Sequence, residues 1–405
     1  MTKSFTEFHG LKRPCPICNG TENSLLFRQA FSKFSDSSTL LSGYDVVTCR
    51  KCGFCFADKI PVQASFDTYY RDMSKYEKAE KGGQDTIDER ARFQTMANVI
   101  LGLLNSPQAR IFEVGCANGQ LLALLKEHGY ANVSGIDPSP VSAKIARERY
   151  NIQVSANTLS GLRLNTEPID FLILAGVLEH VRDLNPALLG LRQLLSADGS
   201  IFISVPDASC YPEGEDAPFQ EFSVEHINFF GPVSLENLLN TNGFIKISIN
   251  QDIIESNYRT RTPVIHGLFK KSDLSILRTY SCDNQTDAGL KSYIDQSTKA
   301  ERFIQTTITK IVGSGKSIII WGTGAHTLRL LATSRLSSAK IRAFVDSNPR
   351  YQGKSLNNVP IIAPGELKGL SEPILISSRV YQEEIENQIR TELNMDNEII
   401  KLYKM

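Results

Sequence analysis

Two pairs of cysteines near the start of the chain have the spacing of metal ligands. Cys15 and Cys18 enclose Pro-Ile, Cys49 and Cys52 enclose Arg-Lys, and residues 19–48 lie between the pairs. Four thiolates on two such turns suit a closed tetrahedral zinc site, which leaves no coordination position open for chemistry. The pattern therefore predicts a structural zinc site with a hairpin between its halves, and redox-active disulfides are the alternative.

A second group of residues surrounds a short loop of small side chains. The apolar run at 110–114 predicts a strand, and Gly-Cys-Ala-Asn-Gly follows it from Gly115 to Gly119. Glycines allow a tight turn and a close approach of the backbone to a ligand. The next predicted strand ends at Asp137, whose carboxylate can accept hydrogen bonds from both hydroxyls of a ribose.

The spacing of this loop differs from the dinucleotide fingerprint. It reads Gly-x-x-x-Gly, and Glu113 stands two residues before the first glycine. An acid at that place suits a methionyl sulfonium ligand better than a pyrophosphate, which needs a free helix N-terminus. A nicotinamide enzyme and glycines that only turn the chain are the alternatives.

A glutamate and a histidine stand next to each other in residues 221–230, EFSVEHINFF. An imidazole held by a neighbouring carboxylate can act as a general base near neutral pH, so Glu225 and His226 are candidate catalytic residues. In the alternative interpretation, His226 only caps a turn. His180, in Leu-Glu-His-Val, is expected to pack or to cap the start of a helix.

Alternating strands and helices must position these side chains. Apolar strand-like runs alternate with helical patterns from Arg110 onwards, which predicts an α/β domain with a parallel sheet covered on both faces. The predicted strands are 110–114, 132–136, 170–175 and 200–205, and the predicted helices between them are 121–128, 141–150 and 186–195. A second α/β alternation begins at 317–321. The length of 405 residues suits two or three domains, and we expect boundaries at 1–65, 66–271 and 272–405.

The overall composition excludes a uniform charge field. Lys+Arg and Asp+Glu both number 44, so nothing in the total favours nucleic acid or anionic membrane as a partner. Residues 1–13 are polar, and no run approaches the roughly 18–20 apolar residues that span a bilayer. We therefore expect a cytoplasmic protein that acts on a small molecule.

The central segment resembles the class I methyltransferases, which use S-adenosylmethionine. EVGCANG is similar to their first motif, IDPS to their second-strand acid, and FLILAGVLEHVRDLNPALLGLRQLLSADGSIFISVPD to the segment across their fourth and fifth strands. The resemblance implies that Glu113 holds the amino end of the cofactor, Asp137 the ribose, and Ser139 and Asn157 the adenine. The full set of implied cofactor residues is Glu113, Gly115, Asn118, Gly119, Asp137, Ser139, Asn157 and Ala175.

The order of the parts resembles the sugar C-methyltransferases over essentially the whole chain. These enzymes have a cysteine-knuckle N-terminus, a class I core with a Glu-His segment and a C-terminal Rossmann-like domain, and they act on nucleotide-linked deoxysugars. The resemblance implies His226 as the base, Glu225 as its neighbour and Tyr76 as a further residue of the site. C-methylation of a keto-sugar is therefore the predicted function; O- or N-methylation of a related small molecule and a non-catalytic cofactor-binding protein are the alternatives.

The last third of the chain carries a second glycine loop, Gly-Thr-Gly, between a predicted strand and a helix. The following strand ends at Asp346. In the resembling family this domain helps to hold the nucleotide of the substrate, which implies that Gly322, Gly324 and His326 lie beside a diphosphate. The alternatives are an independent dinucleotide site, which the missing third glycine disfavours, and a scaffold that only closes the cleft.

Overall fold

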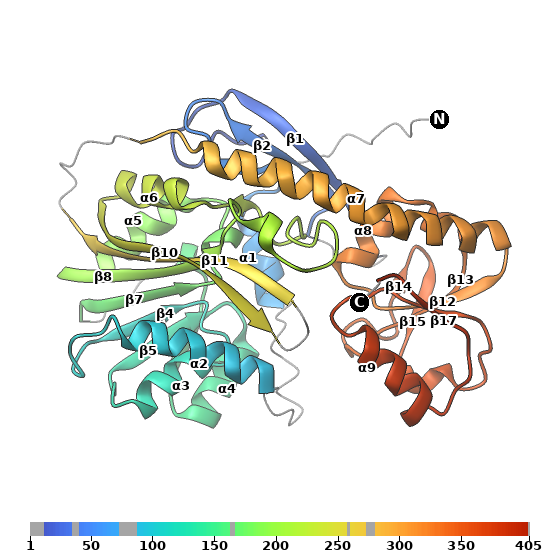
Figure 1. Ribbon diagram of the computed structural model, residues 1–405. Coiled ribbons are helices and arrows are strands. Elements are labelled where there is room, and N and C mark those ends of the chain that lie inside the picture. Colours follow the sequence, from blue (N-terminus) through green and yellow to red (C-terminus); the bar gives the residue numbers. More distant parts are fainter. Residues whose placement is uncertain are drawn as a thin grey trace.

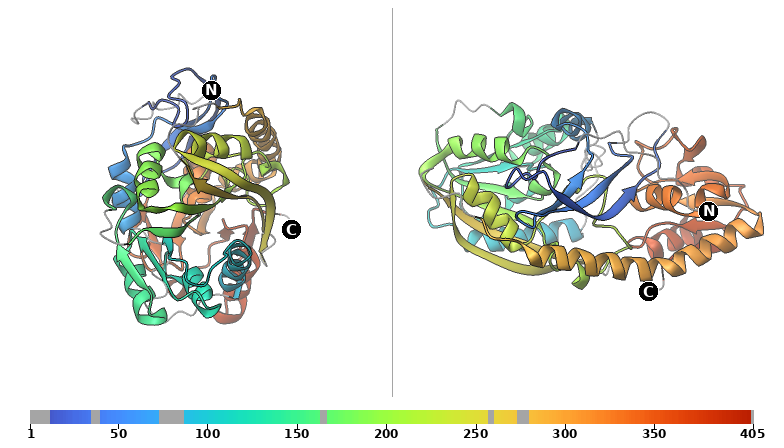
Figure 2. Two further views of the ribbon diagram at one scale, coloured as in Figure 1. Left: turned by 90° about the vertical axis from the view of Figure 1, so that its left-hand side faces the viewer. Right: turned by 90° about the horizontal axis from the view of Figure 1, so that it is seen from above.

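Three β-sheets organise the chain. The computed structural model describes residues 12–34, 40–72, 87–162, 167–256, 260–272 and 280–403. A central seven-stranded sheet and a six-stranded sheet near the C-terminus lie side by side, and a four-stranded sheet near the N-terminus lies at the top of Figure 1, between the two. The helix α7 (Asn284–Ser314) runs along the molecule from the central sheet to the C-terminal one (Figures 1 and 2).

The central sheet has the strand order β10-β11-β8-β7-β4-β5-β6. Its strands are β4 (Ile111–Val114), β5 (Val133–Asp137), β6 (Gln153–Ala156), β7 (Ile169–Ala175), β8 (Leu195–Pro206), β10 (Phe244–Ser256) and β11 (Thr260–Lys271). β6, β5, β4, β7 and β8 are parallel, and β11 and β10 add an antiparallel pair at one edge. This confirms the predicted Rossmann-like α/β class.

Helices cover both faces of this sheet, as the apolar strands require. The helices of the central region are α2 (Ile87–Leu101), α3 (Gln120–Glu127), α4 (Pro140–Tyr150), α5 (Leu184–Leu194) and α6 (Pro232–Thr241). Apolar side chains of α2, α3 and α4 pack with Ile111 and Ile173 in one core cluster. Those of α5 and α6 pack with Leu172 and Ile203 in another cluster. Successive residues of β7, such as Leu172 and Ile173, therefore point to opposite faces of the sheet.

The cysteine region forms the antiparallel sheet β1-β2-β3-β9. β1 (Asn23–Ala30) and β2 (Gly43–Cys49) pair as the hairpin that was predicted between the cysteine pairs. β3 (Cys55–Asp58) follows, and α1 (Gln63–Asp72) leads towards the central region. The fourth strand, β9 (Asn228–Phe229), comes from the segment that follows His226, so the two regions share a sheet.

The C-terminal sheet has the order β14-β15-β13-β12-β16-β17. Its strands are β12 (Ser317–Trp321), β13 (Lys340–Val345), β14 (Ser355–Leu356), β15 (Val359–Ile362), β16 (Ile374–Ile376) and β17 (Ile399–Lys401), with the helices α8 (Ala325–Thr333) and α9 (Gln382–Asn387). The long helix α7 leads into this region from Asn284, where Asp283 caps it by accepting from the amide of Thr286.

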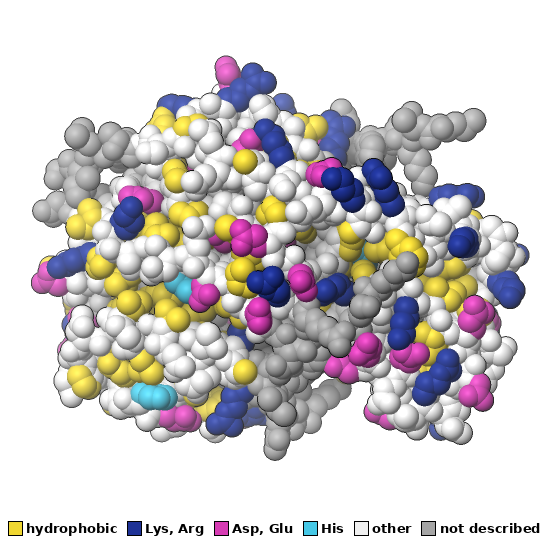
Figure 3. All heavy atoms as spheres, in the orientation of Figure 1, with side chains coloured by type: hydrophobic (Ala, Val, Ile, Leu, Met, Phe, Trp, Pro, Cys, Tyr) yellow, Lys and Arg dark blue, Asp and Glu magenta, His cyan; other side chains and the backbone are white. Residues whose placement is uncertain are grey.

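On the face drawn in Figure 3, basic and acidic side chains are intermixed and form no large patch of one sign. Within the described residues, no helix combines the length and the apolar character needed to cross a membrane.

Candidate functional site

The first glycine loop lies where the sheet order reverses. The chain runs from β4 outward to β5 and β6, then returns to β7 on the other side of β4. Ligands of such sheets bind in the crevice at the carboxyl ends of the strands, at this switch point. Gly115 has a φ of 69°, and a Cβ there would lie 3.0 Å from Val177, which follows β7. The loops after β4 and β7 therefore meet at the expected ligand crevice.

Two buried carboxylates stand in this crevice. Glu113 is 3% exposed, and its Oε2 has no hydrogen-bond partner among the described residues. Burial, together with the charge of Asp137, raises the pKa of Glu113 to about 8. An unsatisfied carboxylate oxygen in a dry site is costly unless a ligand supplies a donor. The site therefore fits a ligand that carries an ammonium group.

Asp137 holds the loop as well as facing the crevice. Its Oδ2 accepts from the amide of Ala117 at 2.9 Å, and its Oδ1 accepts from the amide of Ser139 at 2.9 Å. Burial raises the pKa of Asp137, and these two backbone hydrogen bonds oppose the rise. A carboxylate has further lone pairs, so the same group can still accept from a ribose hydroxyl.

The remaining predicted cofactor residues surround these two acids. Asn118 is 4% exposed within the loop, and Ala175 ends β7. The hydroxyl of Ser139 accepts from the amide of Ser142, so this side chain caps α4. Asn157 donates to the carbonyl of Gly161 at 3.2 Å, which stabilises the turn after β6. Ser139 and Asn157 thus have local structural roles in addition to their predicted place near the adenine.

His226 lies in a cluster of polar side chains. Its Nδ1 is 3.5 Å from Oε2 of Glu221, and its ring centroid is 5.1 Å from that of His180. His180 follows β7 in the 3₁₀ turn Leu178–His180, and its Nδ1 lies 3.0 Å from the carbonyl oxygen of Glu225. The two histidines therefore meet just past the end of β7, at the same sheet edge as the glycine loop.

The carboxylates of this cluster differ from the expectation. The expected partner of the His226 imidazole was Glu225, whereas the carboxylate beside Nδ1 is that of Glu221. Glu225 is 8% exposed and accepts a hydrogen bond from the Tyr69 hydroxyl at 3.1 Å. Burial and the charge of Glu225 raise the pKa of Tyr69, so this hydroxyl keeps its proton at neutral pH. Tyr76, the predicted tyrosine, lies outside the described residues.

The four predicted metal ligands come together. The Sγ atoms of Cys15, Cys18, Cys49 and Cys52 all lie within 4.8 Å of one another, with 3.5 Å between those of Cys15 and Cys52 and between those of Cys18 and Cys49. Hydrogen bonds from the neighbouring thiols hold the pKa of Cys49 well below its ordinary value. A Cβ at Gly20 would lie 3.2 Å from two of these sulfurs, so the turn leaves room for little more than the cluster itself.

The second glycine loop has the geometry of a Rossmann-like half, in which a strand, a glycine loop and a helix follow one another. Asp346 accepts from the amide of Thr323 at 2.9 Å and thereby holds the loop. His326 is 8% exposed, and burial, with the charge of Arg329, lowers its pKa to about 3. His326 is therefore neutral at physiological pH and supplies no cationic charge to a diphosphate. Gly324, which precedes α8, has no atom within 4 Å of where a Cβ would stand.

A cavity of about 240 Å³ lies between the central and C-terminal sheets and shares Glu221 with the His226 cluster. Arg261 on β11, Tyr293 on α7 and Arg379 after β16 line other sides of it. Glu221 and Arg379 were not predicted, since each belongs to the site only through contacts across different elements, and His180 was expected only to pack or to cap a helix. The position of His180 soon after a predicted strand end was the one local signal.

Comparison with known proteins agrees with this geometry. Residues 89–249 match a family model described as a methyltransferase domain, and residues 314–400 match one described as C2185-like, N-terminal. The C-methyltransferase NovU of Streptomyces niveus is 22% identical over 346 residues, which cover 80% of this chain and 77% of NovU. The chain is therefore an S-adenosylmethionine-dependent methyltransferase whose central region matches the methyltransferase family model and which is similar over most of its length to a C-methyltransferase.

Two further similar proteins cover smaller parts of this chain. The ubiquinone biosynthesis O-methyltransferase of Haemophilus ducreyi is 31% identical over 121 residues, which are 27% of this chain and 48% of that protein. A solved structure of the Burkholderia thailandensis 1,6-didemethyltoxoflavin-N1-methyltransferase is 19% identical, with a TM-score of 0.41, and covers 55% of this chain and 98% of its own.

Proposed function

We propose that this methyltransferase transfers a methyl group from S-adenosylmethionine to a carbon of a nucleotide-linked keto-deoxysugar. One observation carries the proposal: two histidines and two buried or half-buried carboxylates meet just past the end of β7, at His226, His180, Glu221 and Glu179. A ring carbon becomes nucleophilic only after a proton next to a ketone is removed, which requires a positioned base. O- and N-methylation need no such base for carbon, because the acceptor already has a lone pair.

His226 is the proposed base, and the geometry assigns its nitrogens. Because Nδ1 faces the carboxylate of Glu221 at 3.5 Å, Nε2 is the nitrogen left to accept the substrate proton. Glu221 would stabilise the imidazolium that forms. Glu225, held by Tyr69, would orient His180 through its backbone carbonyl. Tyr76 remains our further candidate for a contact to the substrate.

The proposed cofactor contacts follow from the crevice. Glu113 would accept from the ammonium group, Asp137 from a ribose hydroxyl, and Gly115, Asn118 and Gly119 would border the methionine part; Ala175 would face the sulfonium, with Ser139 and Asn157 near the adenine. When bound, the cofactor supplies an electrophilic methyl group. The chain's task is then to align the substrate carbon with that methyl, which is mainly positioning.

We propose that the four-cysteine cluster binds one structural zinc ion. Four sulfurs at mutual distances below 4.8 Å match the closed tetrahedral type of site, and the sulfurs of Cys15, Cys49 and Cys52 are shielded by burial. The cluster then stabilises the sheet that β9 completes and takes no part in the chemistry.

The nucleotide part of the substrate is proposed to lie between the central and C-terminal sheets. The cavity that contains Glu221 and Arg379 supports this placement, because it adjoins the His226 cluster and is lined by the guanidinium of Arg379, which lies 3.9 Å from the Glu215 carboxylate and can also contact a phosphate. Gly322 and Gly324 would contribute backbone groups at the start of α8. His326 would contribute hydrogen bonding only, because it is neutral.

Isotope exchange tests this function directly. In deuterated buffer, with S-adenosylhomocysteine bound and a panel of nucleotide keto-sugars, the wild-type enzyme should introduce deuterium at the carbon next to the ketone. We expect His226→Ala to abolish this exchange and to lower turnover by roughly 10²–10⁴, the range of a positioned base. Affinity for S-adenosylmethionine should hardly change.

A second histidine provides the matched control. His128 is exposed at the end of α3, far along the chain from the cluster, and His128→Ala should leave exchange and turnover unchanged. Exchange that persists in His226→Ala would move the role of base to another residue. NMR of the product that places the new methyl on oxygen or nitrogen would contradict C-methylation itself.

A further inference from the structure

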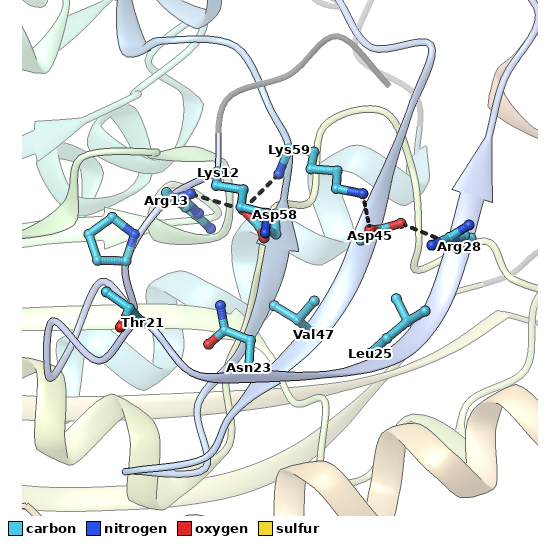
Figure 4. A pocket seen from close by; sticks show the side chains of 11 residues that line it. Lys12, Arg13, Thr21, Asn23, Leu25, Arg28, Asp45, Val47, Asp58 and Lys59 are labelled. Carbon is cyan, nitrogen blue, oxygen red and sulfur yellow. Dashed lines mark hydrogen bonds and ion pairs between the residues drawn. The ribbon is translucent and has the colours of Figure 1, made fainter. Parts of the chain in front are cut away.

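Arg13 is a buried arginine two residues before the first cysteine of the cluster. It is 5% exposed, and its backbone amide donates to Asp58 at 2.9 Å, as Figure 4 shows beside the exposed Lys12. A buried guanidinium must have its donors satisfied, since an unpaired charge in the interior is costly. The hydrogen-bond acceptors of Arg13 therefore show which parts of the fold it connects.

The guanidinium of Arg13 joins three separate segments. Its Nε donates to the carbonyl of Ala57 at 3.0 Å, and its Nη1 donates to the carbonyl of Arg182 at 3.0 Å. Its Nη2 donates to the carbonyl of Ile227 at 2.8 Å and to Oδ1 of Asn228 at 2.9 Å. The planar fork fixes the directions of these bonds, which the single ammonium of lysine cannot reproduce.

The accepting residues lie next to both histidines of the site. Ile227 follows His226 directly, and its amide donates to the carbonyl of Glu179, the neighbour of His180, at 2.8 Å. The Asn228 amide group donates to the carbonyls of Leu178 and Val181, at 2.7 Å each. Arg13 therefore closes a network that ties the His226 segment, residues 223–229, to the turn that carries His180.

The same segment is held from the second cysteine pair. β3 begins three residues after Cys52 and pairs with β9, with Cys55 opposite Phe229 and Phe56 opposite Asn228. Arg13, next to the first cysteine pair, thus forms hydrogen bonds with the His226 segment. β3, which follows the second pair, forms strand pairing with the same segment. Both halves of the cysteine cluster continue directly into contacts with the same stretch of chain.

We propose that Arg13 is a positioning residue that places His226 for catalysis and links its position to the cysteine cluster. The inference rests on the proposed function, in which His226 is the base. Small displacements of a reacting group reduce rates steeply, so loss of the guanidinium should lower kcat roughly 10- to 100-fold. The KM for S-adenosylmethionine should stay within about twofold, because none of these bonds reaches the glycine loop or Asp137.

The experiment compares Arg13→Met and Arg13→Lys with Lys12→Met. Lys12 is the adjacent exposed cation and lines a surface cavity of about 470 Å³ with Arg13, so its variant removes the same charge without the buried bonds (Figure 4). We expect a large loss of kcat in Arg13→Met, a smaller loss in Arg13→Lys and none in Lys12→Met. Hydrogen exchange followed by mass spectrometry should be faster in residues 223–229 of Arg13→Met and unchanged in 133–145.

A third measurement tests the link to the cysteines. In the wild type, removal of bound zinc with a chelator should speed hydrogen exchange in residues 223–229 before it affects 133–145. Arg13→Lys retains the cation and most of the side-chain length, so it carries the kinetic comparison if Arg13→Met does not fold.

The outcomes separate this inference from the function on which it rests. Unchanged exchange in residues 223–229 of both Arg13 variants would overturn the positioning role, whatever the turnover. Faster exchange there with wild-type turnover would support the positioning role and count against His226 as the base. A matched rise in KM for S-adenosylmethionine with unchanged kcat would also overturn the inference, since it would place the effect at the cofactor.

Discussion

Glu113, the proposed partner of the cofactor's ammonium group, should make the stability of this protein depend on pH. In the folded chain without ligand the carboxyl is fully buried with one oxygen unpaired, and its pKa is raised to about 8 from an ordinary value of 4.5. Between these two pKa values the folded state keeps a proton that the unfolded state has lost. Stability should therefore be fully present below about pH 4.5 and should fall as pH rises, until the slope ends near pH 8.

The size of this effect follows from the shift. One pKa unit corresponds to about 1.4 kcal/mol, so a rise from pH 6 to pH 8 should cost about 2–3 kcal/mol of unfolding free energy from this one group. Glu113→Gln removes the titration and keeps the shape, so its unfolding free energy should lose this part of the pH dependence. The exposed Glu127→Gln is the matched control and should retain the wild-type slope.

Denaturant unfolding near pH 6 and near pH 8, without ligand, measures these slopes. Calorimetry of S-adenosylmethionine binding in two buffers of different ionisation enthalpy then tests the ligand side. If an ammonium group pairs with Glu113, binding near neutral pH should release a proton in the wild type, and Glu113→Gln should release less and bind more weakly. Identical pH slopes in the wild type and Glu113→Gln would refute the reasoning.

Two further predictions concern the metal and the ribose. Freshly purified, reduced protein should contain about one zinc per chain, and Cys49→Ser should lower both the zinc content and the stability, whereas the exposed Cys282→Ser should change neither. Absence of zinc from such a preparation would end the metal hypothesis. Asp137→Asn should weaken S-adenosylmethionine binding by about 1.5–3 kcal/mol, the scale of a charge-assisted hydrogen bond. An unchanged calorimetric affinity would mean that the cofactor binds elsewhere.

Local features of the chain were readable because their information is close in sequence. The loop from Gly115 to Gly119 follows a strand that was visible as an apolar run. The φ values of Gly115 and Gly119, 69° and 78°, are those that glycine adopts at little cost. Each Cys-x-x-Cys turn likewise occupies four residues. The four strands predicted for the central sheet lie within one or two residues of β4, β5, β7 and β8 for the same reason, except that β8 begins at Leu195.

Pairings between distant residues could not be predicted in this way. Glu225 is adjacent to His226 and was the natural expectation for its partner, yet the carboxylate beside the imidazole is that of Glu221. Glu221 reaches the ring instead because the chain between them folds back, with the hydroxyl of Ser223 accepting from the amides of Glu225 and His226. The turn at Ser223, and not proximity in the sequence, therefore determines which carboxylate lies beside the His226 imidazole.

The sequence by itself determined the α/β class, the cofactor loop and the four-cysteine pattern, since each depends on local spacing and periodicity. The tertiary structure decided how these parts cooperate. It brought β9 beside β3, placed His180 next to His226 and directed the donors of Arg13 to a carbonyl 214 residues away. Such contacts arise when packing of whole elements brings distant backbone groups together, and no short-range pattern in the chain records them.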